Sequence, residues 1–65
     1  MDAIHRAVEQ AGGQQALAQK LGVRYQAVQK WLRAKRVPAE RVLAIEEATG
    51  GLVSRHELRP DLYPV

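Results

Sequence analysis

Residues 14–33, QQALAQKLGVRYQAVQKWLR, hold two short runs of helical periodicity separated by one glycine, Gly22. Apolar side chains in this stretch can reach a common core only if the chain turns sharply at residues 21–23; they are Leu17, Ala18, Leu21, Val23, Val28, Trp31 and Leu32. Glycine suits such a turn because it adopts positive φ without a steric penalty. The pattern predicts a helix-turn-helix over about residues 14–34.

The outward side chains of the second helix, expected over about residues 24–34, are long, polar or basic, and include no acid. They are Arg24, Tyr25, Gln26, Gln29, Lys30 and Arg33. Arginine, lysine and glutamine recognise purine edges in the major groove of DNA. The sequence therefore predicts a helix-turn-helix domain that binds double-stranded DNA.

The distribution of charge supports this prediction better than the net charge of +3 does. Residues 20–41 carry seven basic side chains against a single acid, Glu40, whereas the rest of the chain has three basic and six acidic residues. A basic cluster alone is weak evidence for nucleic acid, because most charged clusters are simply solvated. Its coincidence with the helix-turn-helix pattern is what makes it informative.

Length and composition exclude several other classes of protein. Sixty-five residues make one domain at most, and the lack of cysteine rules out a disulfide or thiolate metal site. No apolar run approaches the roughly 20 residues of a membrane span, and no export signal is visible. No nucleophile–base pair or phosphate loop appears. We expect a soluble cytoplasmic protein that has no enzymatic activity, no cofactor and no bound metal.

The remaining segments also have helical patterns, so we predict an all-α bundle of four to five short helices. Asp2 can cap a first helix that Gly12 and Gly13 end. Pro38 fits the first turn of a fourth helix, whose inner face is Val42, Ile45 and Thr49 and whose outward side chains are Glu46 and Glu47. Ser54 and Glu57 have capping-box spacing, so a short fifth helix should end before Pro60.

The prolines near the end of the chain predict an extended tail over residues 60–65, following a DNA-binding domain over residues 1–59, because a proline disfavours helix at the residue before it. Leu62 and Tyr63 need a surface to cover. We expect the tail to pack back on its own domain or across a dimer partner.

The chain resembles the phage Cro/CI-type repressor family, especially the small all-helical Cro proteins and their YdaS-type antitoxin relatives. The residues that carry the resemblance are 14–18 (QQALA), 21–23 (LGV), Ala27, Val28, Trp31, 36–41 (RVPAER) and 58–62 (LRPDL). It implies a lambda-repressor-like fold, DNA binding and an origin in a phage or prophage. Two positions depart from the family: Trp31 replaces a smaller aliphatic residue and should be core, and Tyr25 stands where glutamine is frequent. The second departure means that no known operator sequence carries over.

In helix-turn-helix proteins the second helix lies in the major groove and the preceding helix crosses the DNA backbone. We therefore expect base contacts from Tyr25, Gln26, Gln29 and Lys30. Phosphate contacts are expected from Gln14, Gln15, Arg24, Arg33, Lys35 and Arg36. For Arg36 the alternative is an ion pair with Glu40, four residues later.

A domain this small buries little DNA surface, so specific binding generally requires two copies on adjacent half-sites. We expect a homodimer, weak away from DNA. Its interface candidates are Leu52, Val53, Leu58, Leu62 and Tyr63, which could equally cover their own core. The leading hypothesis is a repressor of a palindromic operator. An antitoxin with a toxin partner and a helical protein-interaction module are the alternatives.

Overall fold

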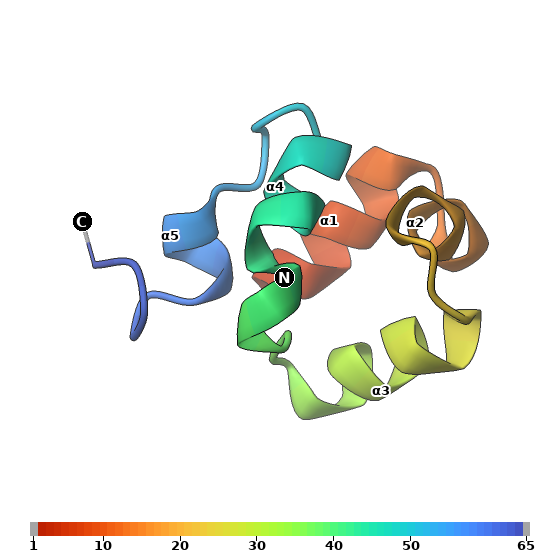
Figure 1. Cartoon of the computed structure of the whole chain (residues 1–65), viewed down its shortest axis with the longest axis horizontal. Coiled ribbons are helices and arrows are strands. Elements are labelled where there is room, and N and C mark those ends of the chain that lie inside the picture. Colours follow the sequence, from red (N-terminus) through yellow and green to blue (C-terminus); the bar gives the residue numbers. More distant parts are fainter. Residues whose placement is uncertain (1, 65) are drawn as a thin grey trace.

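The computed structural model describes residues 2–64, and within them every regular element is helical (Figure 1). The elements are α1 (Ala3–Ala11), α2 (Gln14–Leu21), α3 (Tyr25–Ala34), the 3₁₀ turn η1 (Ala39–Arg41), α4 (Val42–Ala48) and α5 (Arg55–Leu58). The all-α prediction is confirmed; α2 and α3 together span the residues 14–34 expected for the helix-turn-helix, and α3 begins one residue later than expected. None of the helices in this range has the length and apolar character that crossing a membrane requires.

Local interactions account for most helix ends. The Asp2 carboxylate accepts the His5 N–H at 3.0 Å and caps α1. In α5 the Ser54 hydroxyl accepts the Glu57 N–H, while the Glu57 carboxylate accepts the Ser54 N–H, which completes the predicted capping box. Gly22 ends α2 at φ +71°, a conformation that a side chain would strain. The reversal after α2 therefore depends on this glycine.

One apolar core joins all the helices. Helix α2 contacts α1, α3 and α4, and α5 contacts α1 and α4. The buried apolar residues are Ile4, Ala7, Ala11, Leu17, Ala18, Val28, Trp31, Val37, Val42, Ile45, Val53 and Leu58. Trp31 is 8% exposed, so it is a core residue as predicted and cannot stack on a base. In Figure 1, α3 lies along the lower edge of the molecule, with α5 and the tail at the opposite end from α2.

Two expectations about helix α4 are wrong. Pro38 does not lie in the first turn of α4; it precedes η1, and its carbonyl accepts the Arg41 N–H at 3.0 Å. Glu46 does not project freely, because its carboxylate turns back to Arg55 and accepts that residue's backbone N–H at 2.6 Å. The second difference arises because the chain beyond α4 folds back on it and brings Arg55 to Glu46.

The extended tail predicted for residues 60–65 is also wrong where the structure describes it; Val65 lies outside the described residues. The N–H groups of Leu62 and Tyr63 both donate to the Arg59 carbonyl, at 3.1 and 2.9 Å, and form a turn. Tyr63 packs partly on the core of its own domain. The tail therefore covers its own protein.

The same folding-back corrects part of the predicted dimer interface. Val53 and Leu58 are 0% and 7% exposed, so their side chains belong to the core and are not available to a partner. Leu52 and Leu62 remain 64% and 45% exposed. Of the five interface candidates, these two are the side chains that a second molecule could cover most readily.

Candidate nucleic-acid interface

The turn at Gly22 fixes α3 so that its apolar stripe faces the core and its polar stripe faces outward. Val28 and Trp31 supply the buried stripe. On the other side Tyr25, Gln26 and Lys30 are exposed, and Gln29 is half-buried. These are the four residues expected to contact bases, and the structure brings them together on one helix.

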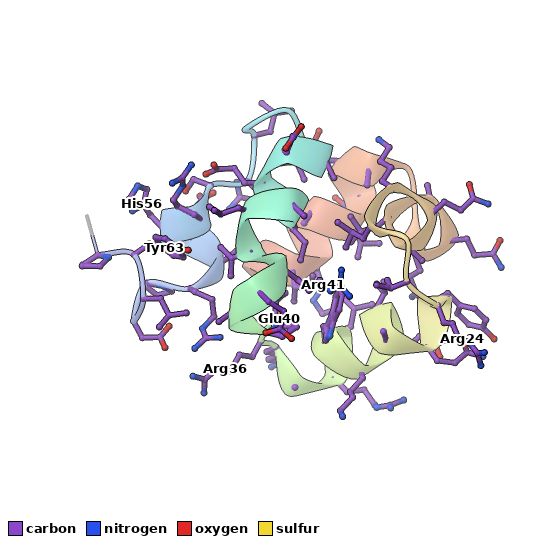
Figure 2. All side chains as sticks on the ribbon, in the orientation of Figure 1. Arg24, Arg36, Glu40, Arg41, His56 and Tyr63 are labelled. Atoms are coloured by element: carbon purple, nitrogen blue, oxygen red, sulfur yellow. The ribbon has the colours of Figure 1, made fainter. Side chains whose placement is uncertain are left out.

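The residues expected to contact phosphates surround this helix. Arg24 is the N-cap residue of α3, but its side chain makes no cap hydrogen bond and is exposed. Arg33 is exposed in the last turn of α3, and Lys35 and Arg36 follow it, also exposed. Figure 2 shows Arg24 and Arg36 at the two ends of α3. Cationic side chains thus extend along the whole length of the outer helix.

The first turn of α2 contributes two amide side chains to the same half of the molecule. Gln15 is exposed and Gln14 is half-buried. Helix α2 packs on α3. The start of α2 is where the expected phosphate contact of a crossing helix would be made.

Lys35 ends α3 in the left-handed conformation, with φ +55°, and it is the one non-glycine residue with positive φ among residues 2–64. Its backbone N–H donates to the Leu32 carbonyl at 3.3 Å. A glycine would adopt this conformation with less strain, but it would have no ammonium group. The lysine at this position adds a cation to the end of α3.

The ion pairs of the described chain involve no cation of α3 itself, although one of them, Arg36 with Asp61, lies just beyond its end. They join Asp2 to His5, Arg6 to Glu57, Arg55 to Glu46, and Asp61 to both Arg36 and Arg59. Within residues 2–64, the cations with no carboxylate within 4.0 Å are Lys20, Arg24, Lys30, Arg33, Lys35 and Arg41. All six belong to the helix-turn-helix or to the segment that follows it. The charge of this face is therefore not neutralised from within the protein.

Carboxylates that form these ion pairs have lowered pKa values, so they stay charged and are neutralised by their own partners. Hydrogen bonds from the Arg55 side chain lower the pKa of Glu46, and the Ser54 backbone N–H lowers that of Glu57. Hydrogen bonds from Arg59 lower the pKa of Asp61 to about 2. The acidic residues thus stabilise α5 and the tail.

Arg36 does not form the alternative ion pair with Glu40. Its guanidinium contacts the Asp61 carboxylate at 3.3 Å instead. In Figure 2, Glu40 and Arg41 extend between η1 and α3, while Arg36 points away from both. The expected competition for Arg36 therefore exists, but with a different acid.

Sequence reasoning missed Arg59, which is 8% exposed. Its Nη1 donates to the Val37 carbonyl at 2.9 Å, and its Nε and Nη2 donate to the two carboxylate oxygens of Asp61 at 2.9 and 2.8 Å. Val37 lies in the connector that follows α3, so Arg59 ties the tail to the end of the outer helix. The sequence feature that could have indicated this ion pair is Arg59-Pro60-Asp61, in which an acid follows the arginine by two residues.

Known proteins are similar to this chain in both sequence and fold. The chain matches the family described as bacterial toxin YdaS over residues 4–65. It is 52% identical over 52 residues to a protein of Escherichia coli (strain K12) named as a candidate transcriptional regulator, YdaS; the match covers 78% of this chain and 53% of that protein. The chain thus spans about half the length of this curated relative.

The structure is similar to that of the Cro protein from a candidate prophage element, Xfaso 1, in Xylella fastidiosa strain Ann-1. The TM-score is 0.96 and the sequence identity is 46%, with 100% of both chains covered. This similarity confirms the Cro-like fold and the resemblance inferred from the sequence. Because the family match extends over nearly all of its residues, the chain belongs to the YdaS family.

Proposed function

We propose that this chain is a sequence-specific, double-stranded DNA-binding transcriptional repressor that recognises its operator with α3. The observation that carries the proposal is the unneutralised face of α3: glutamines and cations on one outward stripe, with no carboxylate contacting those cations within residues 2–64. A protein that occupies a promoter in this way represses it by excluding RNA polymerase. The names of the relatives, a candidate transcriptional regulator and a Cro protein, agree with this role.

With α3 in the major groove, Gln26 and Gln29 suit adenine, because a side-chain amide can pair with N6 and N7 together. Lys30 suits guanine O6 and N7. Tyr25, at the start of α3, can contact a thymine methyl or donate its hydroxyl to a phosphate. These four side chains would determine which sequence is bound.

Arg24, Arg33, Lys35 and Arg36 would contact phosphates and thereby set the position of α3 without distinguishing bases. Gln14 and Gln15 would do the same from the start of α2. If about four to six phosphates are neutralised per subunit, the slope of log affinity against log salt is about −0.9 for each of them. Strong salt dependence is therefore part of the proposal.

We further propose that two copies bind a palindromic operator, with half-sites about one helical turn apart. The exposed Leu52 and Leu62 support an interface at the α5 end of the domain, with Tyr63 beside them. An interface of a few side chains is small, so dimerisation would be weak in solution and completed on DNA.

Selection of bound sequences from a random duplex library tests the proposal. We expect a recovered motif with two-fold symmetry; recovery of unrelated sequences would contradict sequence-specific binding. Lys30→Ala and Arg33→Ala then form a matched pair, because each removes one cation from the exposed side of α3. Lys30→Ala should relax discrimination at one base position, whereas Arg33→Ala should weaken all duplexes alike. Equal effects of the two substitutions on all sequences would contradict the assigned roles.

A role in a toxin–antitoxin pair is the second candidate. The family description names a toxin, whereas the sequence had suggested antitoxin relatives with a toxin partner. An antitoxin that represses its own operon would use the same DNA-binding face and would need a second surface for its partner. Expression of the chain alone and together with the neighbouring gene product, followed by growth measurements, distinguishes these roles.

A further inference from the structure

The carboxylate of Asp61, in the tail turn, contacts two guanidinium groups at once. Its two oxygens accept hydrogen bonds from Arg59, at 2.9 Å from Nε and 2.8 Å from Nη2. Its Oδ2 also accepts from Nη2 of Arg36 at 3.3 Å. The two arginines come from the tail and from the connector that follows α3.

The two contacts differ in strength. The Arg59 side chain is only 10% exposed, makes a two-point contact with Asp61 and is also held by the Val37 carbonyl at 2.9 Å. The Arg36 side chain is 64% exposed and makes a single, longer contact with Asp61. Two-point pairs of arginine and carboxylate are the stronger kind, and exposed single pairs contribute little. Arg59 therefore keeps Asp61 in place, while Arg36 can leave it.

The position of Arg36 matters because it adjoins the outer helix. Arg36 and Arg59 line a hollow of about 360 Å³ together with Lys30 and Trp31 of α3. Lys30 is one of the residues proposed to contact bases. The guanidinium of Arg36 is thus within the surface that would face DNA, but the carboxylate it contacts belongs to its own protein.

We propose that Asp61 is a built-in counterion for Arg36, which a DNA phosphate displaces when the protein binds. This inference depends on the proposed DNA binding and adds a residue that sets the affinity. In free protein Arg36 contacts Asp61, and in the complex it contacts phosphate while Asp61 stays with Arg59. Asp61 thereby lowers the affinity of the protein for DNA. The reduction should be the same for every DNA sequence, because Asp61 does not approach a base.

The exchange also affects the salt dependence. A phosphate neutralised by Arg36 releases a condensed cation from DNA, but the attraction between Arg36 and Asp61 that is lost in the exchange is itself weakened by salt. The two dependences partly offset each other, so the exchange depends less on salt than binding by a free arginine does. Removing the charge of Asp61 should make the slope of log affinity against log salt steeper by up to about one.

The test is a double-mutant cycle on DNA binding with Asp61→Asn, Arg36→Gln and the double variant, measured on a selected duplex between about 50 and 200 mM salt. Glu9→Gln is the matched control: it removes the same charge from an exposed residue of α1 that has no ion pair within residues 2–64. We expect Asp61→Asn to bind about two- to fivefold more tightly, and Glu9→Gln to bind as wild type does. In the Arg36→Gln background Asp61→Asn should have no effect.

Weaker binding by Asp61→Asn would overturn the proposal, because it would mean that Asp61 positions Arg36 for DNA. An equal gain with and without Arg36, or an equal gain in Glu9→Gln, would also overturn it, since the effect would then be one of net charge. If Asp61→Asn does not stay folded, NMR of the wild-type Arg36 guanidinium answers the same question: its contact with Asp61 must disappear when DNA is added. A wild-type protein that binds no duplex at all would refute the proposed function instead.

Discussion

Thr49 offers the sharpest test of how α5 is attached to the bundle. It is one of two buried polar residues within residues 2–64, and it lies at the end of α4. Its hydroxyl donates to the Glu46 carbonyl at 2.9 Å and accepts the Val53 N–H at 3.2 Å. Val53 is fully buried, so its N–H has no access to water as a replacement. The hydroxyl therefore satisfies a donor that would otherwise be orphaned.

Thr49→Val replaces this hydroxyl by a methyl of similar size. The Glu46 carbonyl still accepts hydrogen bonds in this variant, because the backbone N–H groups of residue 49 and Gly51 also donate to it, at 3.2 and 2.9 Å. The Val53 N–H loses its partner, which costs about 1–3 kcal/mol. A cost of about 2 kcal/mol would lower the melting temperature of a domain this small by about 8–16 °C. That loss is a large part of the total stability, about 3–10 kcal/mol for 65 residues.

Thermal unfolding followed by circular dichroism gives the stability, and hydrogen exchange of the Val53 amide gives the mechanism. Thr49→Ser is the matched control, since it keeps the hydroxyl and removes only a methyl, at a cost of about 1 kcal/mol. We expect the Val53 amide to exchange faster in Thr49→Val than in Thr49→Ser. If the valine variant were as stable as the serine variant and its Val53 amide equally protected, the reasoning about an orphaned donor would be refuted.

Three further predictions use the same assays. Gly22→Ala should cost about 1 kcal/mol or more, because alanine is strained at φ +71° even though its Cβ would meet no neighbouring atom; an unchanged melting temperature would contradict this. Trp31→Ala should cost about 3–5 kcal/mol and lower the melting temperature measured by circular dichroism by about 12 °C or more. Acid should lower the melting temperature. Carboxyl groups whose pKa is lowered in the folded protein stabilise it fully when the pH is above their unfolded pKa values, 3.8 or 4.5. This stabilisation is lost as the pH falls toward about 2. The groups are Asp2, Glu46, Glu57 and Asp61.

Features that depend on near neighbours in the chain could be predicted from the sequence. The cap at Asp2, the turn at Gly22 and the capping box of Ser54 and Glu57 each involve residues within three or four positions of one another. The outward stripe of α3 follows from helical periodicity together with the buried position of Trp31. The fold and the composition of the candidate interface can therefore be predicted from the sequence.

Features that depend on distant pairs could not be predicted in the same way. Arg55 reaches Glu46 across nine residues, and Arg59 reaches the Val37 carbonyl across twenty-two. The proline rule correctly disfavours helix at Arg59, but it gives no information on the turn that follows, where Leu62 and Tyr63 donate to the Arg59 carbonyl. Val53 appeared available to a partner for the same reason, since its burial depends on the fold-back of α5.

The separation of paired from unpaired charges connects stability with the proposed function. Each carboxylate that pairs with a cation lies in the N-terminal cap, in α4, in α5 or in the tail. If such carboxylates contacted the cations of α3, they would stabilise the free protein but weaken its binding to DNA, because each phosphate would first have to displace a carboxylate. Within residues 2–64, Arg36 and Asp61 are the one ion pair in which this competition occurs beside the outer helix. A chain of this family with a neutral residue in place of Asp61 should therefore bind DNA with the steeper salt dependence, whatever sequence it recognises.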